Sequence, residues 1–417
     1  MSVSPPRAPL LPLDEALQRL LERAVPLAQT EQVATMDADG RVLAQDVVSA
    51  LQVPAHDNSA MDGYALRRRD VSAPGVVLPV AQRIAAGAVG QPLQPGTAAR
   101  IFTGAPVPQG TYAVVMQEDC TVVSEATATE PARVQINVQP TEGQNIRRAG
   151  EDVASGAVVL ARGCRLGPAE LGLAASIGMA TLTVVRRPRV ALFSTGDELV
   201  MPGDKAPQDM PPGAIYNSNR FFLTALLRRM GCTVTDLGIV PDQRDATIAV
   251  LRQAAASHDV ILTSGGVSVG EEDHVKPAVQ ALGSLDLWHI AIKPGKPFAY
   301  GQVGGAHFIG LPGNPVASFV TFCVLVRPFL LRLQGVEDVA IHPIAVRADF
   351  TTPKADKRRE FLRVRRNASG GVELFHNQSS GVLTSAVWGD GLVDNPANTV
   401  IAAGDTVRFL PFFALLG

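Results

Sequence analysis

The sequence is poor in cysteine, in aromatic residues and in excess charge of either sign. Its 417 residues include 4 cysteines and 5% aromatic residues, and the formal net charge at pH 7 is −2. Cys120, Cys164, Cys232 and Cys323 lie far apart without a C-x-x-C pair, which argues against a zinc knuckle or a disulfide framework and favours a reducing cytoplasm. The near-neutral charge gives no general attraction to nucleic acid or to an anionic membrane, so we expect a small ligand and neither of those partners.

Long uninterrupted apolar runs are also scarce. The longest greasy stretch, residues 316–333, contains Arg327 and Pro328, so we interpret it as a core helix rather than a membrane span. Residues 1–7 do not carry the charged leader and apolar segment of a signal peptide. The length predicts two to four domains.

Five apolar runs that each end in a loop of glycine, serine, proline or acid are the most informative feature present. They span residues 190–198, 237–242, 260–270, 290–297 and 308–315. Helical segments are expected between them, so the pattern predicts a doubly wound parallel α/β domain whose sheet is covered on both faces. Ligands of such sheets bind beyond the carboxyl ends of the strands.

The pattern of apolar and polar residues changes on either side of this region. An amphipathic first helix and a strand-and-helix region predict a small linking α+β domain over 8–54 and 145–186, interrupted by a β-rich insert domain over 55–144. The α/β domain is expected over 187–334. Alternating apolar runs then predict a C-terminal β-barrel domain over 335–417.

A glycine-rich turn follows the third apolar run. In TSGGVSVG (263–270), Gly265, Gly266 and Ser268 can direct consecutive N–H groups and a hydroxyl at a phosphate. The turn matches neither the dinucleotide-binding nor the P-loop pattern. A purely structural turn is the alternative, but acids follow directly, and acids beside a phosphate repel it unless a cation lies between them. Asp273 is therefore our strongest candidate metal ligand.

Other strand ends carry acids and bases. Glu198 and Asp242 follow the first two runs and, with Asp273, are the expected metal ligands; helix capping is the alternative for each acid. Lys293 and Lys296 lie on one proline-stiffened turn that suits an oxyanion better than a solvated charge run. A tight turn at Pro312, Gly313 and Pro315 precedes a helix, whose N–H groups could meet an anion, although an architectural turn is equally compatible.

The insert contains polar clusters that stability does not require. Residues 57–65 include Asp62, residues 100–106 include Thr103, and residues 145–148 include Arg147, a guanidinium suited to bidentate phosphate binding. Each alone is compatible with an ordinary surface.

Together these segments resemble the molybdopterin molybdenumtransferase family, the type of MoeA and the gephyrin E domain. The resemblance runs from about Leu13 to the C-terminus and rests on DNSAMDGYA (57–65), RIFTGAPVP (100–108), STGDEL (194–199), SGGVSVG (264–270), IKPGKPF (292–298) and GLPGNP (310–315). It implies a molybdopterin-binding type of α/β domain in an elongated homodimer. The site would lie between one subunit's α/β domain and the other's insert.

The resemblance also implies a reaction and a site. The family inserts molybdate into adenylylated molybdopterin and releases AMP in a step that depends on Mg²⁺. It implies catalytic roles for Asp62, Glu198, Asp242, Asp273 and Lys293, with Asp273, Asp242 and Glu198 also as metal ligands. It implies substrate contacts for Thr103, Arg147, Gly265, Gly266, Ser268, Lys296, Pro312, Gly313, Pro315, Arg363 and Ser380.

Two departures and two alternatives accompany this interpretation. His289 stands where relatives often have lysine, and Ala149 interrupts an arginine run, so either could alter anion affinity. One alternative function is molybdopterin adenylyltransferase; the other is a non-catalytic pterin-binding scaffold. A transient contact with the adenylylating enzyme is also expected. The choice between molybdate and tungstate, and between metal-binding and basic carboxylates, is left open.

Overall fold

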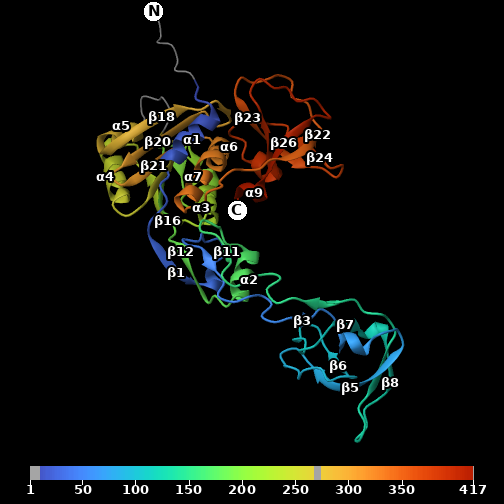
Figure 1. Cartoon of the computed structure of the whole chain (residues 1–417). Coiled ribbons are helices and arrows are strands. Elements are labelled where there is room, and N and C mark those ends of the chain that lie inside the picture. The colour runs from blue at the N-terminus through green and yellow to red at the C-terminus, as the bar shows by residue number, and fades with distance from the viewer. Residues whose placement is uncertain (1–9, 267–273, 417) are drawn as a thin grey trace, which may run out of the picture.

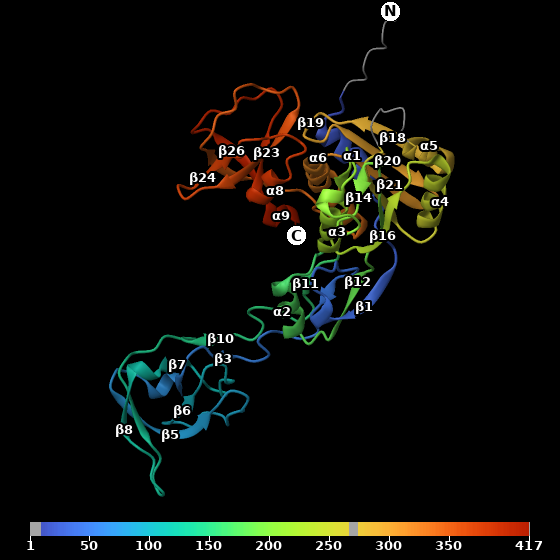
Figure 2. The ribbon, with the colours of Figure 1, turned by 180° about the vertical axis from the view of Figure 1, so that it is seen from behind.

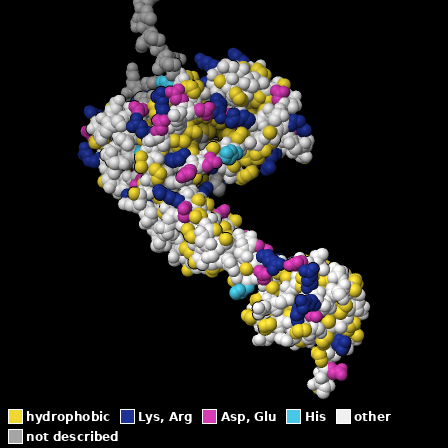
Figure 3. Space-filling view, in the orientation of Figure 1, with side chains coloured by type: hydrophobic (Ala, Val, Ile, Leu, Met, Phe, Trp, Pro, Cys, Tyr) yellow, Lys and Arg dark blue, Asp and Glu magenta, His cyan; other side chains and the backbone are white. Residues whose placement is uncertain are grey.

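The computed structural model describes residues 10–266 and 274–416. The molecule is elongated, with the insert at one end and the α/β region and the C-terminal region side by side at the other (Figures 1 and 2). On the face shown in Figure 3, acidic and basic side chains are interspersed along the whole length.

The α/β region is built on a six-stranded sheet. Its strands are β13 (Arg189–Thr195), β16 (Thr233–Val240), β17 (Val260–Ser264), β18 (Gly283–His289), β20 (Pro297–Val303) and β21 (Ala306–Leu311), in the order β16-β13-β17-β21-β20-β18. The first four in this order are parallel, whereas β20 is antiparallel to both β21 and β18. The predicted multidomain α/β-plus-β fold is confirmed, with a mixed rather than fully parallel sheet.

The fourth apolar run, residues 290–297, does not form a parallel strand of this sheet. It forms the connection from β18 to β20, and within it β19 (Ile292–Lys293) pairs with a strand of the C-terminal region. A short connection can join only antiparallel strands, whereas a parallel crossover needs a dozen or more residues. The seven residues between β18 and β20 therefore reverse the chain.

Alternating side chains on the sheet enter two separate cores. Val190 and Leu192 pack on one face with α1 (Leu13–Arg23), α3 (Asn219–Arg229), α6 (Pro315–Thr321) and α7 (Arg327–Leu333). Ala191 and Phe193 pack on the other with α4 (Arg244–Ala255) and α5 (Val275–Leu282). The period of two along a strand, with both faces covered, explains why the sequence reads as continuous apolar runs.

The longest apolar stretch is a buried helix, as predicted. Residues Pro315–Leu333 are long and apolar enough to cross a membrane, with a mean hydropathy of 1.8, but 89% of the stretch is buried inside the protein. The helix continues past Pro328 because the preceding Phe322–Val326 segment widens into a π-helix. A π-helical turn accommodates the missing proline N–H without ending the helix.

A small region joins the insert to the α/β part. Its elements are β1 (Thr30–Ala34) with β12 (Thr181–Val185), β2 (Val47–Val48) with β11 (Val158–Leu160), a 3₁₀ turn (Thr35–Asp37) and α2 (Pro168–Ser176). These elements share one core, whereas the apolar side of α1 packs into the α/β core. Residues 8–54, which we grouped as one segment, thus contribute to two cores.

The insert is a curled sheet of six strands. These are β4 (Gly63–Leu66), β5 (Val76–Ile84), β6 (Ala98–Ile101), β7 (Ala113–Met116), β8 (Cys120–Ser124) and β9 (Arg133–Ile136), in the order β7-β4-β6-β5-β9-β8. Two 3₁₀ turns, Arg68–Asp70 and Gln117–Asp119, connect them. The chain enters and leaves beside the ribbon that β3 (Asn58–Ser59) makes with β10 (Ile146–Arg147).

The C-terminal region is the predicted β-barrel. It closes through β23 (Arg359–Arg366), β24 (Gly371–Leu374), β22 (Ile344–Ala348), β26 (Thr406–Pro411) and β25 (Gly391–Asn395), which pairs back with β23. Two short helices, α8 (Thr384–Trp388) and α9 (Phe412–Leu416), flank it. The β19–β23 pairing attaches the barrel to the α/β sheet.

Candidate functional site

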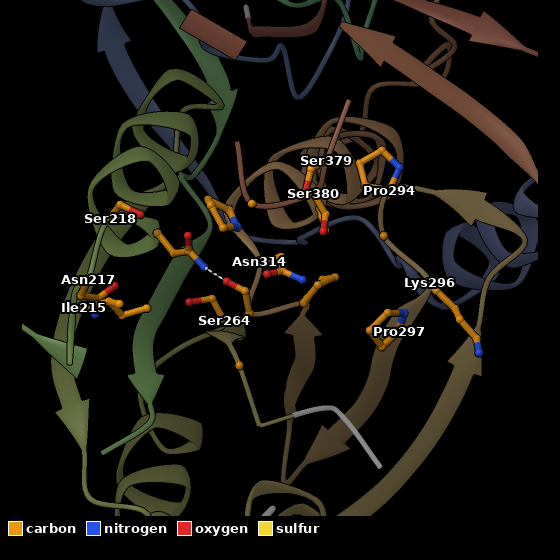
Figure 4. Close-up of a pocket in the computed structure, with 18 of the residues that line it drawn as sticks. Ile215, Asn217, Ser218, Ser264, Pro294, Lys296, Pro297, Asn314, Ser379 and Ser380 are labelled. Atoms are coloured by element: carbon orange, nitrogen blue, oxygen red, sulfur yellow. Dashed lines mark hydrogen bonds between the residues drawn. The ribbon is translucent and has the colours of Figure 1, made fainter. Parts of the chain in front are cut away.

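A cavity of about 950 Å³ lies where the carboxyl ends of the α/β strands face the barrel. Its described lining comes from strand ends, from the β14 (Leu199–Val200) and β15 (Ile215–Tyr216) ribbon, and from two barrel segments. The polar lining residues are Thr195, Glu198, Tyr216, Asn217, Ser218, Asn219, Ser264, Lys293, Lys296, Asn314, Arg358, Gln378, Ser379 and Ser380. In Figure 4, Ser264 and Asn314 lie between the Asn217–Ser218 segment and Lys296.

Strand register brings the site-bearing loops together. Thr195 lies opposite Val240, and Ser264 lies opposite Ser194 on one side and Leu311 on the other. The loops after β16, β13, β17 and β21 therefore leave the same edge. Because β13 connects to β16 on one side while the chain returns to β17 on the other, the crevice between β13 and β17 is the topological switch point at which such sheets bind ligands.

The two predicted glycines lie in this crevice. Gly265 (φ +93°) lines the cavity, and a Cβ there would lie 3.1 Å from the Thr195 carbonyl oxygen. Gly266 (φ +64°) is packed more tightly, since its Cβ would lie 2.5 Å from Val275 Cγ2 and 2.9 Å from Thr195 Oγ1. Both the left-handed backbone and the close approach require glycine.

The predicted proline turn is fixed from two directions. Asn219 Nδ2 at the start of α3 donates to the Gly313 carbonyl oxygen at 2.7 Å, the dashed line in Figure 4. On the barrel side, the Val316 N–H donates to the Ser380 carbonyl oxygen at 2.9 Å. Pro312, Gly313, Pro315 and Ser380, four of the expected substrate contacts, therefore line one cavity.

Three basic side chains, Lys293, Lys296 and Arg358, line the cavity; we call them the cationic wall. Lys293 Nζ donates to Glu360 Oε1 at 2.9 Å and lies 3.3 Å from Asp356 Oδ2. The hydrogen bond to Glu360 is the main reason why the pKa of Lys293 is raised, so the ammonium stays charged. The side chain of Lys296 extends away from Ser264 and Asn314 (Figure 4).

Arg363 supports the cavity from behind. Its side chain is 1% exposed and donates to Ser385 Oγ at 3.1 Å, to the Phe361 carbonyl oxygen at 3.1 Å and to the Ser379 carbonyl oxygen at 3.3 Å. Desolvation lowers the pKa of Arg363 to about 10. Arg363 is not among the residues that line the cavity, and its hydrogen bond to the Ser379 carbonyl oxygen supports the Ser379–Ser380 loop.

The expected carboxylates are only partly placed. Glu198 lines the cavity, and its carboxylate folds over Gly196. Asp242 follows β16 at the same sheet edge but is not among the described lining residues. Asp273 and Ser268 lie outside the described residues. Within residues 10–266 and 274–416, no group of three or more His, Cys, Asp or Glu residues could hold a metal ion.

The insert brings its own predicted residues together. Asp62 Oδ1 accepts hydrogen bonds from the Thr103 N–H at 2.8 Å and from Thr103 Oγ1 at 2.7 Å, and these bonds lower the pKa of Asp62. Arg147 lies opposite Asn58 in the β3–β10 ribbon. Within one chain, the linking region separates the insert, which carries this cluster, from the α/β region and the barrel that form the cavity (Figures 1 and 2).

Both departures noted in the sequence have a structural setting. The Ala149 N–H donates to Asp57 Oδ1 at 2.8 Å and is the main cause of the lowered pKa of Asp57, so the backbone does what any residue at position 149 could do. The pKa of His289 is lowered, first by burial and then by the charges of Lys296 and Lys276. His289 therefore favours the neutral form.

Sequence reasoning missed several lining residues. Residues 217–219 were not among the expected site residues, although Asn217 and Ser218 line the cavity and Asn219 fixes the proline turn. Three small polar residues directly before a helix in an α/β segment were the available signal. Arg358, Gln378 and Ser379 gave no local signal, because only the docking of the barrel brings them to the strand ends.

Comparisons with known proteins agree with this architecture. Residues 11–178 match the MoeA N-terminal region (domain I and II), residues 191–332 match a probable molybdopterin binding domain, and residues 345–412 match the MoeA C-terminal region (domain IV). The chain is 40% identical over 418 residues to the molybdopterin molybdenumtransferase of Haemophilus influenzae, covering 98% of this chain and 100% of that one. The chain belongs to the MoeA family of molybdopterin molybdenumtransferases.

Other members support the same assignment. Molybdopterin molybdenumtransferase 2 of Mycobacterium tuberculosis is 40% identical over 409 residues, covering 94% of this chain and 97% of that one. The crystal structure of the molybdopterin biosynthesis MoeA protein from Pyrococcus horikoshii superposes with a TM-score of 0.83 at 27% identity, covering 97% of this chain and 100% of that one. The expected enzyme class, a transferase of molybdenum cofactor biosynthesis, is thereby confirmed.

Proposed function

We propose that this member of the family inserts molybdate into adenylylated molybdopterin and releases AMP, within a cytoplasmic homodimer. The observation that carries the proposal is the cavity itself, in which the cationic wall and the Ser379–Ser380 loop face the Gly265 turn. Molybdate is a tetrahedral dianion, and the adenylylated pterin carries a phosphoanhydride. A site that combines charged donors with backbone N–H groups suits both.

The cavity residues have separable roles in this proposal. Lys293 and Arg358 come from different regions and present charged donors on the barrel side, where an oxyanion would bind. The Gly265 turn and the Pro312–Pro315 turn supply the close backbone approach that a phosphate needs. Positioned donors stabilise charge that develops on a leaving phosphate without having to reorganise during the reaction.

The metal expected from the family is Mg²⁺, a hard cation that takes carboxylate oxygens as ligands. Glu198 lines the cavity and Asp242 follows the neighbouring strand, so carboxylate oxygens are available at one sheet edge. These residues, with Asp273, would hold the ion, which would shield the charge of the phosphoanhydride when bound. Substituting Asp273 with Asn tests its part: AMP release at the unchanged rate would remove Asp273 from the mechanism.

The insert would act in the partner subunit's site. Asp62 and Thr103 are held together by two hydrogen bonds, and Arg147 lies in the adjoining ribbon, yet the cluster lies far from the cavity of its own chain (Figure 1). A two-fold symmetric dimer would give each cavity the insert of the other subunit. Sedimentation at several concentrations measures the oligomeric state, and a strictly monomeric active enzyme would rule this arrangement out.

One assay separates the proposed activity from its alternatives. The purified protein is incubated with adenylylated molybdopterin, Mg²⁺ and molybdate, and AMP is measured. Release of AMP that depends on molybdate is the expected result. A requirement for ATP together with molybdopterin would indicate adenylyl transfer instead, and no reaction under either condition would indicate a binding scaffold. Replacing molybdate with tungstate in the same assay measures the choice of oxyanion.

A further inference from the structure

Two barrel carboxylates pair with two residues of the cationic wall, Lys293 and Arg358. Glu360 accepts a hydrogen bond from Lys293 Nζ at 2.9 Å, and Asp356 accepts two from the Arg358 guanidinium, Nε at 2.9 Å and a terminal nitrogen at 2.8 Å. Lys293 and Arg358 are among the lining residues of the cavity, whereas Asp356 and Glu360 are not. The cations thus face the cavity, and the acids lie behind them.

Burial shows the same order. The side chains of Lys293 and Arg358 are 43% and 28% exposed, whereas those of Asp356 and Glu360 are 18% and 7% exposed. Glu360 also receives a hydrogen bond from Asn395 Nδ2 at 3.4 Å, within the barrel. Parallel pairing of Lys293 with Glu360 in the β19–β23 ladder fixes the two backbones side by side. Glu360 is therefore a buried part of the barrel sheet, and Asp356 lies in the segment just before β23.

The charges of these four residues cancel. Lys293 and Arg358 contribute two positive charges, and Asp356 and Glu360 contribute two negative charges a few ångströms further from the cavity. A dianion in the cavity would be attracted by the nearer pair and repelled by the farther pair, and the repulsion from Glu360 is the less screened because that side chain is only 7% exposed. Such an arrangement directs donors at an oxyanion while limiting how tightly it is held.

We propose that Glu360 and Asp356 are positioning residues that orient Lys293 and Arg358 toward the oxyanion and weaken its binding, so that molybdate can be handed on rather than retained. This inference rests on the proposed function, since it takes the oxyanion at the cationic wall to be molybdate. A transfer enzyme gains nothing from stabilising its bound substrate as strongly as the transition state, because that stabilisation does not raise kcat. The barrel would thereby set the affinity of a site whose glycine turns belong to the α/β domain.

The test is Glu360→Gln, which removes one negative charge but keeps an oxygen that can accept the Lys293 hydrogen bond. We expect the dissociation constant of molybdate, measured by calorimetry on the whole protein, to fall at least about fivefold, with a steeper dependence on salt. In the AMP-release assay, KM for molybdate and kcat should both fall. Damage to the fold would weaken binding, so tighter binding cannot come from a merely structural role.

A control and a second variant keep the result interpretable. Glu373→Gln removes the same charge from the exposed Arg365–Glu373 pair of the barrel, outside the cavity lining, and should leave molybdate binding unchanged. Asp356→Asn provides an independent variant should Glu360→Gln fold poorly, and should also tighten binding. Unchanged or weaker binding in folded Glu360→Gln or Asp356→Asn protein would overturn this inference alone. Wild-type protein that binds no molybdate would instead overturn the proposed function.

Discussion

The insert and the cavity both carry residues of the expected site, but they complete their polar contacts in different ways. In the insert, Asp62 is satisfied by Thr103, and Asp57 by Arg148 and the Ala149 N–H, which directly follow the β3–β10 ribbon at the base of the insert. At the cavity, Lys293 of the α/β region finds its partners, Glu360 and Asp356, only in the barrel. The polar contacts of the insert cluster are complete without the rest of the protein, whereas the cavity exists only because the α/β region and the barrel dock.

The two regions therefore depend on different parts of the assembly. The geometry of the insert cluster should survive changes elsewhere in its chain, but its use in catalysis depends on a second subunit. The cavity depends on the docking of its own barrel, through the β19–β23 pairing and the Ser380–Val316 hydrogen bond. Substitutions in the insert and substitutions at the cavity should therefore have different effects.

The largest expected effect comes from separating the two regions between subunits. Asp62→Ala and Lys293→Ala should each abolish AMP release, the first in the insert and the second at the cavity. After the two variants are unfolded, mixed in equal amounts and refolded together, random pairing in a two-fold dimer should restore about a quarter of the wild-type activity, because half the dimers contain one intact site of two. Each variant refolded alone is the control, and a mixture no more active than its components would contradict a shared site.

A pair of glycines compares crowding in the two regions. Gly266 at the cavity and Gly96 in the insert have similar backbone angles, φ +64° and φ +72°, but a Cβ at Gly266 meets Val275 and Thr195 whereas one at Gly96 meets nothing within 4 Å. Gly96→Ala should cost about 1 kcal/mol for the left-handed backbone alone. Gly266→Ala should cost about 2 kcal/mol more and reduce AMP release. Urea unfolding measures the loss of stability in both variants. Equal losses would show that the residues around Gly266 move aside at no cost in free energy.

Two arginines compare buried and exposed contacts. Arg363→Lys removes the fork that bonds Ser385, Phe361 and Ser379 in a buried position, and should cost about 2 kcal/mol because backbone acceptors lose their donors. Arg148→Lys in the insert changes a side chain that is 58% exposed and should cost less than about 0.5 kcal/mol. The free energies of unfolding of the two variants test this comparison. A loss of stability in Arg363→Lys no larger than that in Arg148→Lys would mean that the Ser379–Ser380 loop does not depend on Arg363.

The smallest expected effect is a dependence on pH. Burial and nearby lysines lower the folded-state pKa of His289 from 6.5, so its contribution to stability is present above pH 6.5 and is lost as the pH falls through the folded value. His289→Gln should remove this loss. The difference between wild type and variant should change by a few tenths of a kcal/mol, about what a solvent-screened group can contribute, between pH 7 and pH 5. No change in that interval would show that His289 titrates as it does in the unfolded chain.

Much of the fold could be predicted from local pattern. The apolar runs over residues 190–198 and 260–270 predicted buried strands, which form over Arg189–Thr195 and Val260–Ser264 with alternating side chains in two cores. The apolar stretch after Pro315 was correctly predicted as a core helix. The run at residues 290–297 is not a strand of the α/β sheet, because a β-rich composition does not specify a partner, and its Ile292–Lys293 segment pairs with the barrel.

The same limit applies to the candidate site. Gly265, Glu198, Lys293 and the Pro312–Pro315 turn were identifiable because glycines, acids and lysines at strand ends have a chemical signature that a short segment carries by itself. Arg358 and Ser379 were not, because nothing near them in the chain indicates that they would face strand ends of the α/β region.

The sequence by itself determined the strands, the strained glycine turns and the charged residues that follow them, since these depend on backbone sterics and on neighbours along the chain. Only the tertiary structure decided that Lys293 is paired with Glu360, that Arg363 supports a loop rather than lining the cavity, and that the insert lies far from the cavity of its own chain. The reason is physical. Ion pairing and the exclusion of solvent depend on distances through space, and these distances are fixed only when regions that are widely separated in the sequence pack together.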